Sequence, residues 1–163
     1  MSDDAQEPAP ARDTILICYD GSDGAKRAIE VAHGIAGDCR ATVLHLWEPP
    51  GRWMFTDAFG GMPTWSPAQI TEVDDVMRER GGKVLDEGVQ LARDAGFDAE
   101  GHLEPSATSE WRTILDVGDE LDVRLIILGG RGLSAVESAI LGSVSNAIVH
   151  HSRRPVLIVP PVS

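Results

Sequence analysis

Val123-Arg124-Leu125-Ile126-Ile127-Leu128, followed at once by Gly129-Gly130-Arg131-Gly132, is the stretch of sequence that decides the fold. The apolar run predicts a buried strand, and the glycines that follow predict a tight turn. A helix is expected from Gly142-Ser143 onward, and Pro155 is expected to end it. Val156–Val159 is then predicted as the next strand. A strand–turn–helix–strand order of this kind is typical of parallel strands joined by a right-handed crossover.

The same order occurs near the start of the chain. Residues 15–19 predict a buried strand, which ends in Asp20-Gly21-Ser22. Ser22 is a good N-cap for the helix that follows, and Gly37 is expected to end that helix. Residues 41–47 are the second predicted strand. The predicted core face of the helix between them consists of Ala25, Ala28, Ile29, Ala32, Ile35 and Ala36.

The middle of the chain supplies the remaining elements. A helix is predicted over about residues 68–95, and Gly81-Gly82 should weaken or bend it. Residues 97–103 predict a weak strand at a sheet edge, and Thr108 or Ser109 can cap a further helix. The whole alternation predicts an α/β fold, with a doubly wound parallel sheet of five strands that is Rossmann-like. We expect a disordered tail at 1–12 and one domain at 13–163, with a long loop at 51–67.

Composition narrows the classes of partner. The chain has 163 residues and a net charge of −12, from 14 Lys and Arg against 26 Asp and Glu. Such a chain repels nucleic acid and anionic lipid, so we expect neither nucleic acid nor a membrane as partner. Two cysteines form no disulfide framework, and the N-terminus has no signal-peptide pattern. A cytoplasmic location is therefore expected.

Two predicted strands end in residues that suit a ligand site. In open α/β sheets, ligands bind beyond the C-terminal ends of the strands. The strand ends here carry Asp20 and the Gly129–Gly132 turn. The start of the helix at Gly142 would add free N–H groups and a favourable dipole, which together bind anions. The hydroxyls of Ser143 and Ser145 could also bond to phosphate oxygens, so the sequence predicts a phosphate site.

Two common nucleotide-binding patterns do not match the sequence. The GxxxxGK[ST] pattern requires a lysine before the Ser or Thr, and no lysine follows Lys83. Gly21 and Gly24 give only GxxG, which does not match the dinucleotide pattern. Adjacent helical residues such as His150 and His151 do not face each other, so they predict no metal site. We identify no catalytic residues and no protein metal ligands, although Asp20 could meet the metal of a bound Mg-ATP.

The spacing Gly129-x2-Gly132-x9-Gly142-Ser143, with Asp20 after the first strand and the closing residues 155–160, resembles the universal stress protein family. The resemblance covers residues 14–160, and the glycine pattern is that of the ATP-binding branch. It implies the adenine nucleotide alpha hydrolase-like form of the fold and ATP, with Mg²⁺, as ligand. It also implies that Asp20 faces the ribose or the metal. The further positions that it implies for nucleotide contact are Cys18, Tyr19, Leu46, Leu128, Gly129, Arg131, Gly132, Gly142, Ser143, Val144 and Ser145.

Three functions remain open at this point. The first is ATP-dependent regulation in a stress response, in which ATP orders the 51–67 loop and changes a surface for an unknown protein partner. The second is a nucleotide-free dimeric interaction protein, and the third is a slow ATPase. A cyclic adenine nucleotide is a further possible ligand. Because Val156–Val159 is apolar and expected at a sheet edge, and because the family pairs this strand across a dimer axis, we predict a homodimer through it.

Overall fold

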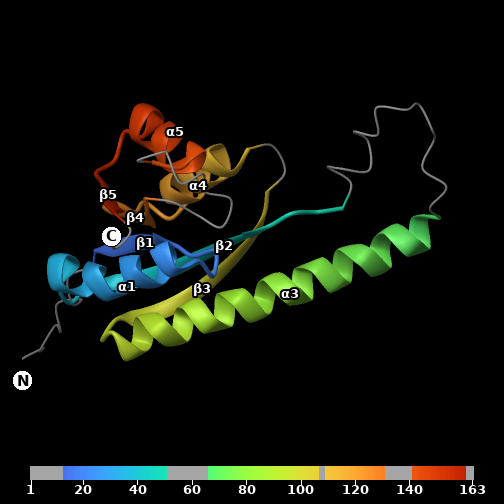
Figure 1. The fold of residues 1–163 in the computed structure, drawn as a ribbon, viewed down its shortest axis with the longest axis horizontal. Helices are drawn as coiled ribbons and strands as arrows, with labels where there is room; N and C mark the ends of the chain where they lie inside the picture. Colours follow the sequence, from blue (N-terminus) through green and yellow to red (C-terminus); the bar gives the residue numbers. More distant parts are fainter. Residues whose placement is uncertain (1–12, 51–65, 107–108, 131–140, 161–163) are drawn as a thin grey trace, which may run out of the picture.

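The computed structural model describes residues 13–50, 66–106, 109–130 and 141–160. Within them, one sheet contains the parallel strands β1 (Thr14–Cys18), β2 (Arg40–Trp47), β3 (Asp98–Pro105), β4 (Leu125–Gly129) and β5 (Val156–Val159). The spatial order is β3-β2-β1-β4-β5 (Figure 1). The predicted five-stranded parallel α/β fold is thus confirmed. The expected tail at 1–12 and almost all of the 51–67 loop lie outside the described residues.

Helices cover both faces of this sheet. α1 (Asp23–Ala36) and α3 (Pro67–Asp94) lie on one face, and α4 (Glu110–Glu120) and α5 (Ser143–His151) lie on the other (Figure 1). Alternate residues of each strand therefore point into two separate cores. Ile15 and Ile17 of β1 pack under α1 and α3, whereas Leu16 packs under α4 and α5. None of the helices in the described residues is both long and apolar enough to cross a bilayer.

The limits of α1 follow from its caps. The Ser22 hydroxyl accepts a hydrogen bond from the N–H of Ala25 at 3.2 Å, as expected for an N-cap. Gly37 ends the helix at φ 65°, a conformation that costs glycine little. The prediction that Ile35 belongs to the core face is wrong, because its side chain is 59% exposed. Ala36 instead closes the buried stripe, one position further along the helix.

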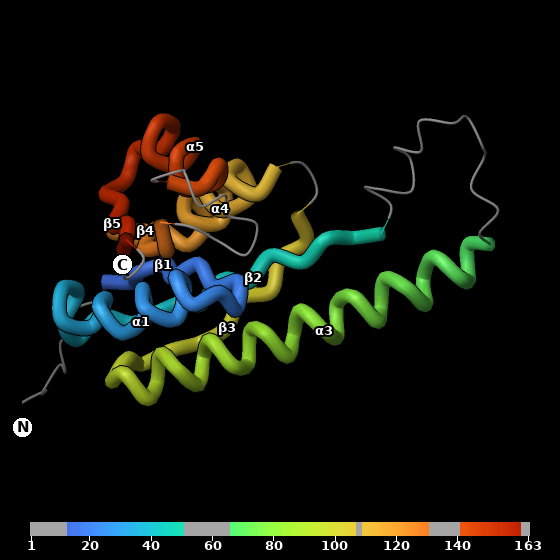
Figure 2. Tube along the Cα trace, in the orientation of Figure 1, coloured from blue at the N-terminus to red at the C-terminus, as the bar shows by residue number. Residues whose placement is uncertain are grey.

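Gly81-Gly82, which were predicted to weaken or bend the long helix, do not end it. α3 continues through both residues as one helix (Figure 2). A Cβ at Gly81 would lie 3.0 Å from Trp47 Cβ, and one at Gly88 would lie 2.5 Å from Tyr19 Cδ1. These glycines let the helix backbone approach β2 and the end of β1. Burial in α3 begins at Gly81, so the N-terminal half of the helix reaches beyond the sheet.

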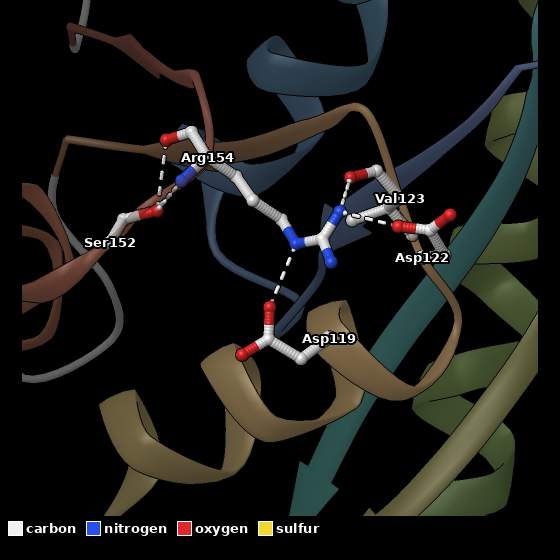
Figure 3. Close-up of polar contacts among 5 residues, drawn as sticks. All are labelled: Asp119, Asp122, Val123, Ser152 and Arg154. Carbon is white, nitrogen blue, oxygen red and sulfur yellow. Dashed lines mark hydrogen bonds and ion pairs between the residues drawn. The ribbon is translucent and has the colours of Figure 1, made fainter.

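Arg154 joins the end of α4 to the start of β5 (Figure 3). Its Nε lies 2.9 Å from Asp119 Oδ1, and its Nη1 lies 3.1 Å from Asp122 Oδ1. Nη1 also donates to the carbonyl of Val123. The backbone N–H of Arg154 donates to Ser152 Oγ at 3.1 Å, just after α5 ends. One side chain therefore fixes the α5–β5 connection against α4.

The sheet has β3 and β5 as its two edges. This agrees with the weak alternation at 97–103 and with the short apolar strand predicted at the end of the chain. In β5, Val156, Leu157 and Ile158 are partly exposed, and only Val159 is buried. β5 pairs with β4 from Ile126↔Val156 to Gly129↔Val159. Its other side is an edge of the sheet as the described residues form it.

Candidate functional site

The candidate site lies where β1 and β4 are neighbours in the middle of the sheet. Ile15 pairs with Leu125 and Ile17 with Ile127. After β1 the chain passes through α1, on one face of the sheet, and enters β2, the neighbour of β1. After β4 it passes through α5, on the other face of the sheet, and enters β5, which lies on the opposite side of the β1–β4 pair. The two connections diverge at this point, so the C-terminal ends of β1 and β4 form the crevice where ligands bind in such sheets.

The end of β1 forms a tight turn into α1. Asp20 Oδ1 accepts a hydrogen bond from the N–H of Ser22 at 3.0 Å, and Gly21 has φ 81°. Positive φ strains any residue with a Cβ, so this position favours glycine. The side chain of Tyr19 is only 2% exposed and packs against Gly88 of α3. Its phenol is therefore withdrawn from the crevice, and only the backbone of Tyr19 is available to a ligand.

Burial and charge keep the protons on both side chains that precede Asp20. Burial, and then the negative charge of Asp20, raise the pKa of the Cys18 thiol from 9.0 to about 12. Burial, followed by the carboxylate of Glu87, raises the pKa of Tyr19 well above its usual range. Near neutral pH both groups are uncharged and poor nucleophiles. These two residues can therefore shape a site, but they supply no reactive anion.

The end of β4 is bonded directly to the start of α5. The N–H of Gly142 donates to the carbonyl of Gly130 at 2.7 Å, and the N–H of Gly130 donates to the carbonyl of Val159 at 2.7 Å. The strand–turn glycines and the helix-start glycine, which are far apart in sequence, are thus neighbours in space. Arg131 and Gly132 lie outside the described residues, so their predicted phosphate contacts stay predictions.

The first turn of α5 leaves backbone donors at its N-terminus. The helical ladder begins with the bond from Asn146 N to Gly142 O at 2.9 Å. The N–H groups of Ser143, Val144 and Ser145 therefore point out of the helix end, where the dipole also favours an anion. The hydroxyl of Ser145 donates its only proton to Gly129 O at 3.0 Å. Ser143 is exposed, and its hydroxyl makes no hydrogen bond within the part of the chain that the structure describes, so its proton is available to a phosphate.

Gly129 is required by a neighbouring helix. A Cβ at this position would lie 2.7 Å from the carbonyl carbon of Gly24 and 2.8 Å from its oxygen. Gly129 does not have positive φ, so backbone freedom is not the reason for glycine here. The end of β4 instead lies directly against the first turn of α1. This contact holds the two halves of the crevice at a fixed separation.

The backbone of Leu46 faces the crevice from the β2 side. The last bond of the β1–β2 ladder runs from Tyr19 N to Leu44 O at 2.8 Å. In a parallel ladder the N–H and C=O of Leu46 point to the same side of β2 as those of Leu44. At the position of Leu46, however, β1 has already ended. Cys18, Leu46 and Val144 are partly buried apolar groups on the α4–α5 face. Each of the three packs against the same core, and among the described residues no bond continues the β1–β2 ladder to the backbone of Leu46.

Two residues of the site were not predicted from the sequence. Gly130 makes both bonds that join β4 to α5 and β5, and its place in a Gly-Gly pair was the available signal. His45 Nδ1 lies 2.8 Å from the carbonyl of Tyr19, and nothing in the sequence signals that contact. His151 stacks on Trp111, with ring centroids 4.5 Å apart, although the residue is exposed. Among the described residues, no group of three or more His, Cys, Asp or Glu could hold a metal ion.

Comparisons with known proteins agree with this geometry. The model of the Universal stress protein family matches residues 11–160. A universal stress protein of Thermus aquaticus, from the 3′ region of a QAH/OAS sulfhydrylase, is 36% identical over 148 residues, which cover 90% of this chain and 97% of the relative. Universal stress protein YxiE of Bacillus subtilis is 30% identical over 148 residues, with 89% and 97% covered.

Solved structures share the fold. The hypothetical protein MJ0577 superposes with a TM-score of 0.74 at 19% identity, over 94% of this chain and 99% of that one. A universal stress protein crystallised in complex with cAMP superposes with a TM-score of 0.62 at 25% identity, over 91% of this chain and 97% of that one. The arrangement of strands and helices is therefore shared along almost the whole chain.

Proposed function

The chain belongs to the universal stress protein family, and we propose that it binds ATP, with Mg²⁺, as a regulatory ligand in the crevice between β1 and β4. The observation that carries the proposal is the bond between Gly142 N and Gly130 O. It holds a helix N-terminus at the switch point of the sheet, where the dipole and free N–H groups bind phosphate.

The phosphates occupy the α5 end of the crevice in this proposal. The N–H groups of Ser143, Val144 and Ser145 supply hydrogen bonds, and the exposed hydroxyl of Ser143 adds another. Backbone donors in a helix start bind anions without an opposing cationic side chain. This local site offsets the unfavourable long-range field of a chain with net charge −12. We expect Arg131 and Gly132 to extend the same site.

In this proposal the base lies against Cys18, Leu46 and Val144, which pack on the same core. Adenine presents an exocyclic amine donor beside a ring nitrogen acceptor, and the C=O and N–H of Leu46 are their complement. The cAMP complex of a protein 25% identical to this chain supports an adenine ligand. The ribose then lies near Asp20, whose carboxylate can reach either a hydroxyl or the metal carried by the triphosphate.

Stable binding without fast chemistry is the expected behaviour. Cys18 and Tyr19 hold their protons at neutral pH, so neither activates water or attacks a phosphate. A regulatory ligand requires only that occupancy change a surface for a protein partner. Slow ATP hydrolysis is the alternative, and steady ADP release that disappears in Asp20→Ala would favour it. The free thiols of Cys18 and Cys39 suit the reducing cytoplasm.

We further propose a homodimer formed through β5. Its side chains Val156, Leu157 and Ile158 are apolar and only partly buried. An apolar edge strand of this kind readily pairs with another chain, and a twofold copy satisfies both edges reciprocally. Sedimentation of the intact protein, with Leu157→Lys as the disrupting variant, tests this pairing separately from nucleotide binding.

Calorimetry with Mg-ATP tests the ligand. We expect micromolar binding by the wild type, complete loss in Gly142→Asp, and a roughly two- to tenfold loss in Ser143→Ala, the cost of about one hydrogen bond. Gly82→Ala is the matched control, because its Cβ meets nothing within 4 Å. Cyclic AMP added in competition distinguishes the two adenine ligands. A folded wild type that binds neither nucleotide would favour the nucleotide-free interaction protein.

A further inference from the structure

His45 makes a contact that ends the β1–β2 ladder. Its Nδ1 lies 2.8 Å from the carbonyl oxygen of Tyr19, the residue that follows β1. A carbonyl can only accept, so Nδ1 carries the proton and donates it. In a continued parallel ladder, the next donor to the carbonyl of Tyr19 would be the N–H of Leu46. The imidazole thus stands in for the next rung of the ladder.

The packing of α3 keeps the ring in this position. His45 shares its face of β2 with Ala41 and Val43, which pack under α1 and α3. A Cβ at Gly81 would lie 3.4 Å from His45 Cδ2, within van der Waals contact, so the imidazole lies against this turn of α3. The phenol of Tyr19 is likewise packed against Gly88. Both partners of the bond between His45 and Tyr19 are therefore held against the same helix.

We propose that His45 is a positioning residue for the nucleotide base: by holding the Tyr19 carbonyl, it stops the ladder one rung early and keeps the N–H and C=O of Leu46 available as a donor–acceptor pair. This inference rests on the proposed function and adds a source of specificity to it. The pair selects a base with an amine donor next to a ring acceptor, as in adenine. Hypoxanthine presents the opposite order on the same edge.

Three variants distinguish the donated proton from the mere presence of a side chain. In His45→Asn, the amide nitrogen takes the place of Nδ1 and retains the donor. In His45→Leu, a side chain of similar size has no donor. In His45→Gln, the donor lies one bond further out, where it corresponds to Nε2. If the His45→Leu protein fails to fold, the comparison of the His45→Asn and His45→Gln variants still tests the proposal.

The first measurement is calorimetry with ATP and with inosine triphosphate. The wild type should prefer ATP. His45→Leu and His45→Gln should lose about tenfold in ATP affinity and most of that preference, the equivalent of about one to two hydrogen bonds. His45→Asn should stay within about threefold of the wild type. Equal affinities for all four proteins, or equal losses in the His45→Asn and His45→Gln variants, would overturn the proposal.

The second measurement needs no ligand. Amide hydrogen exchange of Leu46 in the nucleotide-free protein should be fast in the wild type and in His45→Asn. In His45→Leu the Tyr19 carbonyl becomes available to the N–H of Leu46, so its exchange should slow. A wild-type protein that binds no ATP but shows this pattern would refute the proposed ligand and leave the ladder argument standing. Unchanged exchange in His45→Leu would refute the ladder argument itself.

Discussion

Gly129→Ala is the substitution that tests the geometry of the site most directly. The added Cβ would lie 2.7 Å from Gly24 C, 2.8 Å from Gly24 O and 3.0 Å from Ala25 N. All three atoms belong to the backbone of the first turn of α1, so no side chain can move aside. Overpacking in a well-packed interior costs about 1–3 kcal/mol, and contact with backbone favours the upper end of that range. The loss of unfolded-state entropy on replacing glycine returns less than about 1 kcal/mol.

A cost of about 3 kcal/mol corresponds to a decrease in Tm of roughly 6–12 °C for a domain of this size. Separating β4 from α1 should also move Gly130 and with it the start of α5, so ATP affinity should fall at least about tenfold. Thermal unfolding and calorimetry on the same samples measure both effects. Gly82→Ala is the control, since a Cβ at that position meets nothing within 4 Å. A Gly129→Ala protein with wild-type Tm and affinity would refute the claim that this glycine maintains the helix–strand contact.

Three further predictions concern other positions of the fold. Gly82→Ala should raise the free energy of unfolding by about 0.5–1 kcal/mol, because its Cβ points into open space. Gly88→Ala should lower the free energy of unfolding, because its Cβ meets the ring of Tyr19. Urea unfolding measures both changes, and changes of the same sign would contradict the prediction. The pKa of Cys18 is raised from 9.0 to about 12, so the contribution of the protonated thiol to stability is complete below pH 9 and is lost as the pH rises from 9 toward 12. The difference in free energy of unfolding between the wild type and Cys18→Ala should therefore change across that pH range. Iodoacetamide should label Cys18 slowly at about pH 7. Arg154→Lys should lower the free energy of unfolding by about 1–3 kcal/mol, since one ammonium group cannot replace the divergent bonds to Asp119, Asp122 and Val123. An unchanged Tm would contradict the role given to Arg154.

The sequence predicted the position of the site because strand ends in a parallel sheet follow from periodicity and connection order. The runs at 15–19 and 123–128 end in Asp20 and Gly129, and the parallel arrangement alone brings such ends to one edge. Local patterns could not identify the neighbours of individual residues. Gly81 was predicted only to weaken or bend its helix, because propensity considers the helix alone, whereas its close approach to Trp47 and Leu103 depends on the fold.

The same limit applies to exposure and to hydrogen-bond partners. Ile35 has the spacing of a core residue, but the last turn of α1 buries Ala36 and leaves Ile35 59% exposed. Ser145 looked like a phosphate ligand because its hydroxyl stands in the first turn of α5. Its proton is used within the fold by Gly129, which is sixteen residues earlier in the chain. Long-range contacts of this kind require coordinates.

The central pairing of β1 with β4 also has a consequence for how the protein is made. Residue 15 pairs with residue 125, so the crevice has only one wall until the last third of the chain has left the ribosome. The strands β1, β2 and β3 and the helices α1 and α3 can associate earlier, but non-local closure of this kind is the slow part of folding. Nucleotide can bind only after β4 and α5 have joined, and then it stabilises the finished domain by mass action, by about 2.7 kcal/mol at a hundredfold excess over Kd. ATP in the newly made protein would therefore act as a late check on complete folding.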